Sequence, residues 1–85
     1  KFEYKNITTG ATTVVKSGTG VLKAITVNST AAGTITVYDN TSAAGTKIAT
    51  LKASVVEGTY EYNIAFATGL TIVTGAASDI TVSYR

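Results

Sequence analysis

Short alternating runs of β-branched and aromatic residues, separated by small turn residues, constrain this fold more than any other feature. Threonine makes up about one residue in five, and Val, Ile and Tyr are frequent. These residue types favour strands. Gly, Asn, Asp and Ser interrupt the runs about every ten residues, and no segment has a sustained helical period. The chain is therefore predicted to be all-β.

Eight strands are predicted, at residues 2–8, 11–16, 21–28, 34–39, 47–51, 59–66, 70–74 and 79–84. In the fourth strand, Ile35 and Val37 share one face, while the threonines and Tyr38 share the other. One apolar and one threonine-rich face are typical of an antiparallel sheet with a solvated side. The pattern favours a small antiparallel β-sandwich, jelly-roll-like with eight strands or immunoglobulin-like with seven.

The length of 85 residues fits a single domain spanning residues 1–85. A chain this short buries only about 60% of its unfolded surface, so its core is small. The absence of Cys and His excludes disulfides and nearly excludes a zinc site. The absence of Pro leaves sheet edges thinly protected. We therefore expect a homo-oligomer, in which a neighbouring subunit covers these edges.

The charge pattern gives no sign of a nucleic-acid or membrane partner. The net charge is +2, and the basic residues form no run or stripe. No apolar run reaches the roughly 18 residues that a membrane helix needs. The chain begins at Lys1 rather than Met, which indicates either a processed N-terminus or an initiator missing from the printed sequence.

The stretch YDNTSAAGTK, residues 38–47, is predicted to be a turn. Asp39 and Asn40 are residue types that cap turns, and Gly45 supplies positive φ. A calcium loop would need several carboxylates at fixed spacing, and this stretch has one. GTG at 18–20 is likewise interpreted as a β-hairpin turn rather than a phosphate loop.

No catalytic, metal or cofactor residues are predicted. Without His and Cys, Ser-His-Asp and Cys-His arrangements are impossible within the chain. Glu57 and Glu61 are the nearest acids in sequence, but a turn residue and a strand residue do not indicate a glycosidase pair. Tyr60 and Tyr62 are predicted to lie in the core, and Tyr38 to be the exposed aromatic residue that makes a contact.

Three asparagines begin Asn-X-Ser/Thr triplets, which are glycan acceptors in a secreted chain: Asn6, Asn28 and Asn40. A threonine-rich chain produces such triplets by chance, so they are only mildly suggestive of a secreted protein.

Two segments carry a family resemblance: TVVKSGTGVLKAITVNSTAAGTITVYDNTSAAGTKI at 13–48, and YNIAFATGLTIVTGAASDITVSYR at 62–85. Together they resemble a group of short uncharacterised proteins in tailed-phage genomes. Members of that group are usually taken to be virion structural components, such as capsid decoration proteins. The resemblance covers roughly residues 11–85 and brings no catalytic motif. It implies a non-enzymatic virion protein that binds itself and a capsid or tail lattice.

Loops carry binding on a rigid sandwich, so contacts are expected at 28–33, 39–46 and 74–79. The candidate interaction residues are Phe2, Tyr4, Asn28, Tyr38, Asp39, Asn40 and Asp79. The alternative function is a secreted extracellular filament or surface-fibre subunit. In that case residues 1–10 would form an N-terminal arm or exchanged strand that completes the sheet of a neighbour.

Overall fold

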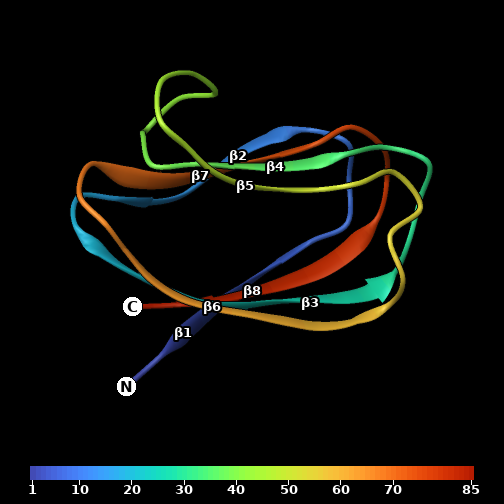
Figure 1. Ribbon diagram of the computed structural model, residues 1–85, viewed down its shortest axis with the longest axis horizontal. Helices are drawn as coiled ribbons and strands as arrows, with labels where there is room; N and C mark the ends of the chain where they lie inside the picture. Colours follow the sequence, from blue (N-terminus) through green and yellow to red (C-terminus); the bar gives the residue numbers. More distant parts are fainter.

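The computed structural model describes all 85 residues as eight strands in two facing sheets, with no helix (Figure 1). No helix long and apolar enough to cross a membrane occurs. The strands are β1 (Glu3–Ile7), β2 (Thr12–Ser17), β3 (Gly20–Ser29), β4 (Ile35–Tyr38), β5 (Lys47–Leu51), β6 (Gly58–Phe66), β7 (Gly69–Thr74) and β8 (Asp79–Tyr84). All eight predicted strands are confirmed.

The strand order is that of a jelly roll. Sheet A has the order β1-β8-β3-β6, and sheet B has the order β2-β7-β4-β5. Every pairing is antiparallel, and β4-β5 is the only pair of strands adjacent both in sequence and in a sheet. The predicted jelly-roll-like sandwich is confirmed, and the immunoglobulin-like alternative does not apply.

The core fills the space between the two sheets. Its members come from strand positions whose side chains point inward, as Ile35 and Val37 do on β4 and Ile80 and Val82 do on β8. The largest fully buried side chain is Phe66, at the end of β6. The prediction of an apolar face opposed by a threonine-rich face is therefore correct for these strands.

Polar residues line up across the outer faces. On sheet A, one row crosses all four strands through Asn6, Thr81, Thr26 and Thr59. The hydroxyls of Thr26 and Thr59 lie 3.0 Å apart and share a hydrogen bond. A comparable row on sheet B contains Thr12, Val73, Thr36 and Thr50. Each broad face of the sandwich thus carries a row made mainly of threonines.

The GTG segment at 18–20 does not close a hairpin, so that prediction is wrong. β2 lies in sheet B and β3 lies in sheet A, and the segment carries the chain from one sheet to the other. Gly18 has a φ of 94°, which glycine adopts at little cost, and its N–H donates to the Thr68 carbonyl at 2.9 Å. A local turn signal shows that the chain reverses, but the partner of each strand depends on packing elsewhere.

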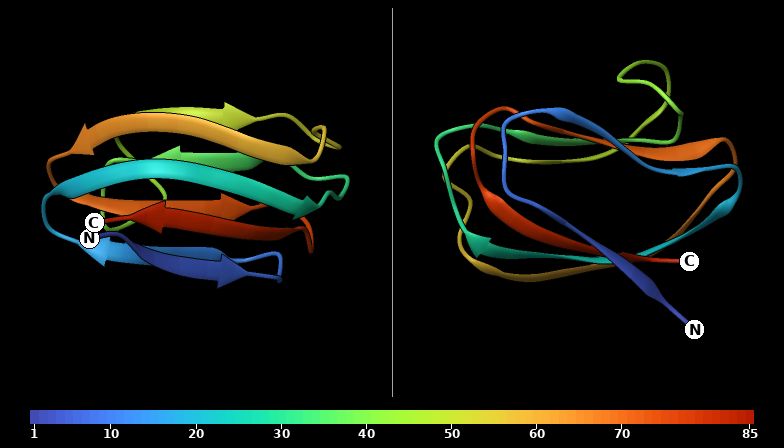
Figure 2. Two further views of the ribbon diagram at one scale, coloured as in Figure 1. Left: turned by 90° about the horizontal axis from the view of Figure 1, so that it is seen from below. Right: turned by 180° about the vertical axis from the view of Figure 1, so that it is seen from behind.

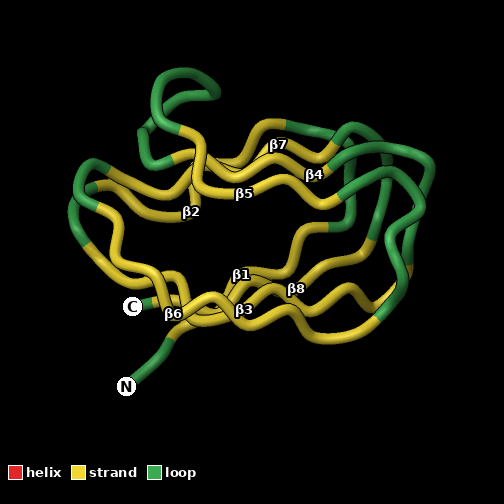
Figure 3. The backbone as a smooth tube through the Cα atoms, viewed as in Figure 1, coloured by secondary structure: helices red, strands yellow, loops and turns green.

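The sandwich has two open edges. One is formed by β1 and β2, and the other by β5 and β6, which lie at opposite sides of the molecule (Figure 2). Loops connect the sheets at both ends of the sandwich (Figure 3), and the two chain termini lie side by side near one end. No neighbouring strand covers either edge.

Candidate interaction surface

The exposed large apolar side chains lie only at the two open edges. At the β1/β2 edge they are Phe2 (43% exposed), Tyr4 (74%) and Val14 (49%). At the β5/β6 edge they are Val56 (72%), in the loop that joins the two strands, and Ile64 (39%). No exposed large apolar side chain lies on the central strands. The edges are therefore the apolar parts of this surface.

At the β1 edge, Phe2 is held against two cations. Its ring lies 5.1 Å from the Arg85 guanidinium carbon and 6.0 Å from Lys23 Nζ. Cations near an aromatic face are attracted by the ring quadrupole, so this contact positions the start of β1. Tyr4, two residues on, is the most exposed aromatic side chain, beside Ser83 of β8.

At the β6 edge, the strand is interrupted by a bulge at Asn63. Asn63 has a φ of 54°, and the pairing with β3 shifts register at this point. Asn tolerates this left-handed conformation better than most residues. The bulge accompanies the partial exposure of Ile64, whose neighbour Phe66 is buried. Residues 58–61 form the regularly paired part of the edge strand before the bulge.

The two tyrosines before the bulge, Tyr60 and Tyr62, are half-buried, so their prediction as core residues is correct only in part. They pack against the core from the edge of sheet A. Burial, assisted by the neighbouring Tyr60, raises the pKa of Tyr62 above its ordinary value of 10.0. The Tyr60 hydroxyl donates to the Val56 carbonyl and so ties the preceding loop to β6.

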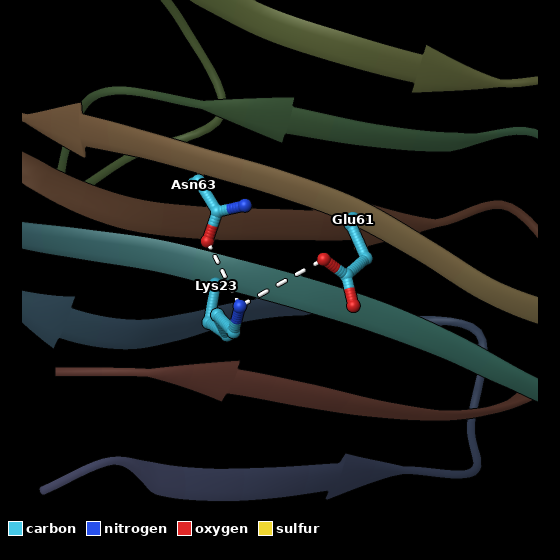
Figure 4. A network of polar contacts seen from close by, with 3 residues as sticks. All are labelled: Lys23, Glu61 and Asn63. Atoms are coloured by element: carbon cyan, nitrogen blue, oxygen red, sulfur yellow. Dashed lines mark hydrogen bonds and ion pairs between the residues drawn. The ribbon is translucent and has the colours of Figure 1, made fainter.

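On the outer face beside the β6 edge, Lys23 joins two β6 side chains (Figure 4). Its Nζ donates to Asn63 Oδ1 at 3.1 Å and lies 3.7 Å from Glu61 Oε1. Exposed ion pairs contribute little to stability. The contact does, however, hold the Glu61 side chain on the outer face of β6.

The charges on the two edges of sheet A differ in sign. At the β1 edge lie Lys1, Glu3 and Lys5, all exposed, with a net charge of +1 from their side chains. At the β6 edge lie Glu57 and Glu61, both exposed, and Lys23 lies 3.7 Å from Glu61, so these three side chains have a net charge of −1. The edges of sheet B each carry one lysine, Lys16 on β2 and Lys47 on β5.

A second group of polar residues joins three strands of sheet A. Asp79 Oδ1 accepts hydrogen bonds from Asn6 Nδ2 at 2.8 Å and from Asn28 Nδ2 at 3.2 Å. Both amides also reach the Thr81 hydroxyl. The network fastens the edge strand β1, through β8, to β3. The side-chain amides of Asn6 and Asn28, which begin two of the Asn-X-Ser/Thr triplets, are thus hydrogen-bonded within the fold.

Asp39 closes a turn at the opposite end of the sandwich. Its carboxylate accepts the backbone N–H groups of Ala67 and Thr68, at 3.0 and 2.9 Å, and more weakly that of Gly69 at 3.4 Å. These hydrogen bonds, that from Ala67 first, lower the pKa of Asp39 below its ordinary 3.8. Asn40 closes its own loop by donating to the Ala44 carbonyl at 2.8 Å.

The prediction of a turn at 39–46 is therefore correct, and Asn40 caps it as expected, but the Asp39 carboxylate caps a different turn, at 67–69, which sequence reasoning missed. Thr71, which lies on the outer side of sheet B, is fully buried because the loop covers it, and its hydroxyl donates to the Asn40 carbonyl at 2.7 Å. Tyr38 lies half-buried, so its prediction as the exposed aromatic residue is wrong. The most exposed aromatic residue is Tyr4 instead.

The predicted interaction residues form three separate groups. Phe2 and Tyr4 lie at the β1 edge, and Asn28 and Asp79 share the sheet A network. The other three, Tyr38, Asp39 and Asn40, end β4 in sheet B. The predicted contact loops are divided too: 28–33 and 74–79 meet at one end, where a Cβ on Gly33 would lie 2.5 Å from the Ala76 nitrogen. The loop at 39–46 lies at the other end, against Gly69.

Sequence reasoning missed the apolar residues Val14, Val56 and Ile64. A signal for the exposure of Val56 was present in the sequence, because Val56 lies in the turn before Glu57-Gly58, outside any alternating strand pattern. The surface has no pocket, and no three acidic side chains gather where a metal ion could bind.

Comparison with known proteins gives a structural likeness only. No protein-family model matches the chain, and no curated protein matches it. Among solved structures, the chain is similar to the core of Drosophila NLP, whose crystal structure was described for its insight into pentamer formation and histone binding. The match has a TM-score of 0.61 at 17% identity and covers 99% of this chain and 95% of that one. At this identity, the likeness shows a shared β-rich fold.

Proposed function

We propose that this protein is a non-enzymatic structural subunit that self-associates, and that it belongs to a bacteriophage virion as a capsid decoration or other particle-surface component. The observation that carries the self-association is the confinement of exposed apolar side chains to the two open edges. The virion assignment rests on the resemblance of residues 11–85 to tailed-phage structural proteins.

The small core supports the need for association. Only 18 of the 85 residues are buried, and no disulfide is possible in a chain without cysteine. Domains of this size gain stability when a partner subunit buries further apolar surface. The edges provide that surface, since their side chains would leave water on contact with another copy.

The Drosophila NLP core provides a precedent for assembly by a β-rich domain of similar size, because its description concerns a pentamer. Histone binding is not part of the proposal. Histones are strongly basic, whereas this chain has a net charge of +2 and only five acidic residues.

Two measurements test the proposal separately. Light scattering on a size-exclusion column is expected to give a discrete oligomer over a wide range of concentrations, and a monomer throughout would contradict self-association. Mass spectrometry of purified virions is expected to detect the chain in stoichiometric amounts. Intact particles that lack it would contradict the virion role without affecting self-association.

A second candidate is a secreted filament or surface-fibre subunit that assembles by strand addition. It is favoured by the position of β1, an edge strand whose only strand partner is β8. Deletion of residues 1–10 distinguishes the two candidates. In a strand-exchange filament the deletion abolishes polymerisation, and a synthetic peptide of residues 1–10 then caps the vacant site and yields single subunits. A discrete oligomer that survives the deletion contradicts strand exchange.

A further inference from the structure

We infer that the backbone of residues 67–69 forms a preorganised binding site for a small carboxylate anion, which the protein's own Asp39 side chain fills. The inference is independent of the proposed self-association, because it concerns a turn at one end of the sandwich rather than the sheet edges. Removal of the Asp39 side chain is expected to leave a vacant site that binds formate from solution.

The site consists of successive backbone N–H groups that converge on one point. The N–H groups of Thr68 and Gly69 donate to Asp39 Oδ1, at 2.9 and 3.4 Å. The N–H of Ala67 reaches both carboxylate oxygens, at 3.1 Å for Oδ1 and 3.0 Å for Oδ2. Successive N–H groups that point into one concavity of a turn form a binding site for an anion. The donors belong to the backbone, so no side-chain substitution in the turn is needed to make them.

Contacts other than those of the carboxylate hold this turn in place. The residues on its two sides, Phe66 and Leu70, are fully buried in the core. The Thr19 hydroxyl donates to the Phe66 carbonyl at 3.0 Å, and the Gly18 N–H donates to the Thr68 carbonyl at 2.9 Å. Both donors lie in the crossover from β2 to β3. The turn therefore keeps these anchors when the carboxylate is removed.

Gly69 is enclosed by neighbouring segments. A Cβ at this position would lie 2.8 Å from Thr41 Cγ2 and 3.0 Å from the carbonyl oxygens of Asn40 and Lys16. The backbone at Gly69 thus has little space in which to turn its N–H away. We therefore expect the N–H groups at 67–69 to keep their directions in the absence of the side chain, which is what a preorganised site requires.

Backbone dipoles, rather than a cation, hold the carboxylate. Asp39 makes no salt bridge, since the one ion pair in the structure joins Lys23 to Glu61. The lowered pKa of Asp39, caused first by the hydrogen bond from Ala67, agrees with a site that favours the charged form. Hydrogen bonds to an ionised acceptor are roughly twice as strong as those between neutral groups. The site therefore favours an anion over water.

The geometry selects a small planar anion. The Ala67 N–H reaches both oxygens of the carboxylate, which an anion with two oxygens on one carbon reproduces. Asp39 is only half-buried, so the space that its side chain leaves is open to solvent. The substitution Asp39→Gly removes the carboxylate together with Cβ, and formate, the smallest carboxylate, is the matched replacement.

Chemical rescue tests the inference. At one fixed protein concentration, the urea midpoint of Asp39→Gly is expected to be below that of wild type in sodium chloride. It is expected to rise and then saturate as sodium formate replaces the chloride at constant ionic strength. At twice the dissociation constant, formate raises the folding constant about threefold. In amide NMR spectra, the signals of residues 67–69 are expected to shift along the same binding curve. Wild type is expected to show neither response, because its site is filled.

Two control variants isolate the backbone site. Asp79 is also half-buried and also accepts two hydrogen bonds, but its donors are the side-chain amides of Asn6 and Asn28. Side-chain donors rotate away when their acceptor is removed, so Asp79→Gly is expected to be destabilised without a response to formate. Asp39→Asn leaves an amide of the same shape in the site, and formate is expected to have no effect on it.

Every outcome decides the inference. A saturable response in Asp39→Gly, absent from Asp79→Gly, supports it, as does refolding in formate of a variant that is unfolded in chloride. An equal response in the two glycine variants would show a general salt effect and overturn it. A folded Asp39→Gly that ignores formate would overturn it as well. If neither Asp39→Gly nor the milder Asp39→Ala folds in either salt, the carboxylate forms the turn rather than fills it, and the inference is wrong. Self-association, measured by light scattering, stands or fails separately.

Discussion

Replacement of Gly20 by alanine is expected to be among the single changes that destabilise this sandwich most. A Cβ at this position would lie 2.2 Å from the Arg85 carbonyl oxygen and 2.6 Å from Phe66 Cζ. Real Cβ atoms essentially never approach another heavy atom closer than 3.0 Å. The Arg85 backbone must therefore move by most of an ångström, and the buried ring must move as well.

The cost has two parts. Overpacking against the ring and backbone costs about 1–3 kcal/mol. The displaced Arg85 backbone also makes two hydrogen bonds with Val21, at 2.7 and 3.0 Å, and each contributes about 1 kcal/mol. We expect a loss of about 2–4 kcal/mol, allowing for partial relaxation. A domain of this length has about 4–13 kcal/mol of stability, so the loss is a large fraction of the total.

Urea unfolding followed by tyrosine fluorescence at one fixed protein concentration measures this loss, since the chain has five Tyr and no Trp. The control is Gly18→Ala, where a Cβ meets nothing within 4 Å and the φ of 94° alone opposes the substitution. That control is expected to lose about 1 kcal/mol. If both variants lose the same amount, or if Gly20→Ala loses less than the control, the steric reasoning is refuted.

Four further changes have defined outcomes. Phe66→Ala is expected to cost about 3–5 kcal/mol by urea unfolding, because the ring is fully buried, and a loss below about 1 kcal/mol would mean that the ring is not core. A double-mutant cycle with Thr26→Val and Thr59→Val is expected to give a coupling of about 0.2–1 kcal/mol, and additivity would show that the shared hydrogen bond contributes nothing. The folded-state pKa of Asp39 is depressed, so its contribution to stability is present above pH 3.8 and is lost as the pH falls through the folded-state value. The variant Asp39→Asn is therefore expected to be less stable than wild type at neutral pH, and to lose less of its unfolding free energy on acidification. A pH series of urea unfolding midpoints measures both effects. Because the folded-state pKa of Tyr62 is raised, stability is retained below pH 10.0 and declines as the pH rises above it, and Tyr62→Phe is expected to flatten that decline relative to wild type.

Local alternation was sufficient to predict the strands. In β4, Ile35 and Val37 alternate with polar residues, and the structure buries both. Period-two patterns record which side of a strand faces the core, so they identify strands and faces without knowledge of partners.

Partners and edges were not predictable from the same information. The GTG turn has identical chemistry whether it joins paired strands or crosses between sheets. Ile64 has the spacing of a core residue, but it is partly exposed because it lies on an edge strand, directly after the left-handed Asn63 where the register shifts. Whether Tyr4 or Tyr38 is exposed depends on which strand lies at an edge and which loop covers it. These are properties of strand order, which no short window of sequence contains.

The capping role of Asp39 was hidden for a similar reason. Its partners, the backbone N–H groups at 67–69, lie 28 to 30 residues further along the chain. Backbone amides have no residue signature, so a turn-forming Asp that caps a distant turn looks the same in sequence as one that caps its own.

The jelly-roll strand order also dictates when the chain can fold during its synthesis. β1 pairs only with β8, and β2 pairs only with β7, so the first two strands of the sandwich cannot pair until its last two strands have been made. Only β4 and β5 can pair soon after both have left the ribosome. Folding dominated by such distant pairings takes milliseconds to seconds in domains of this kind. A nascent chain therefore keeps β1 unpaired until β8 has left the ribosome, and a stall within β8 would leave β1 without its partner and open to association with another chain.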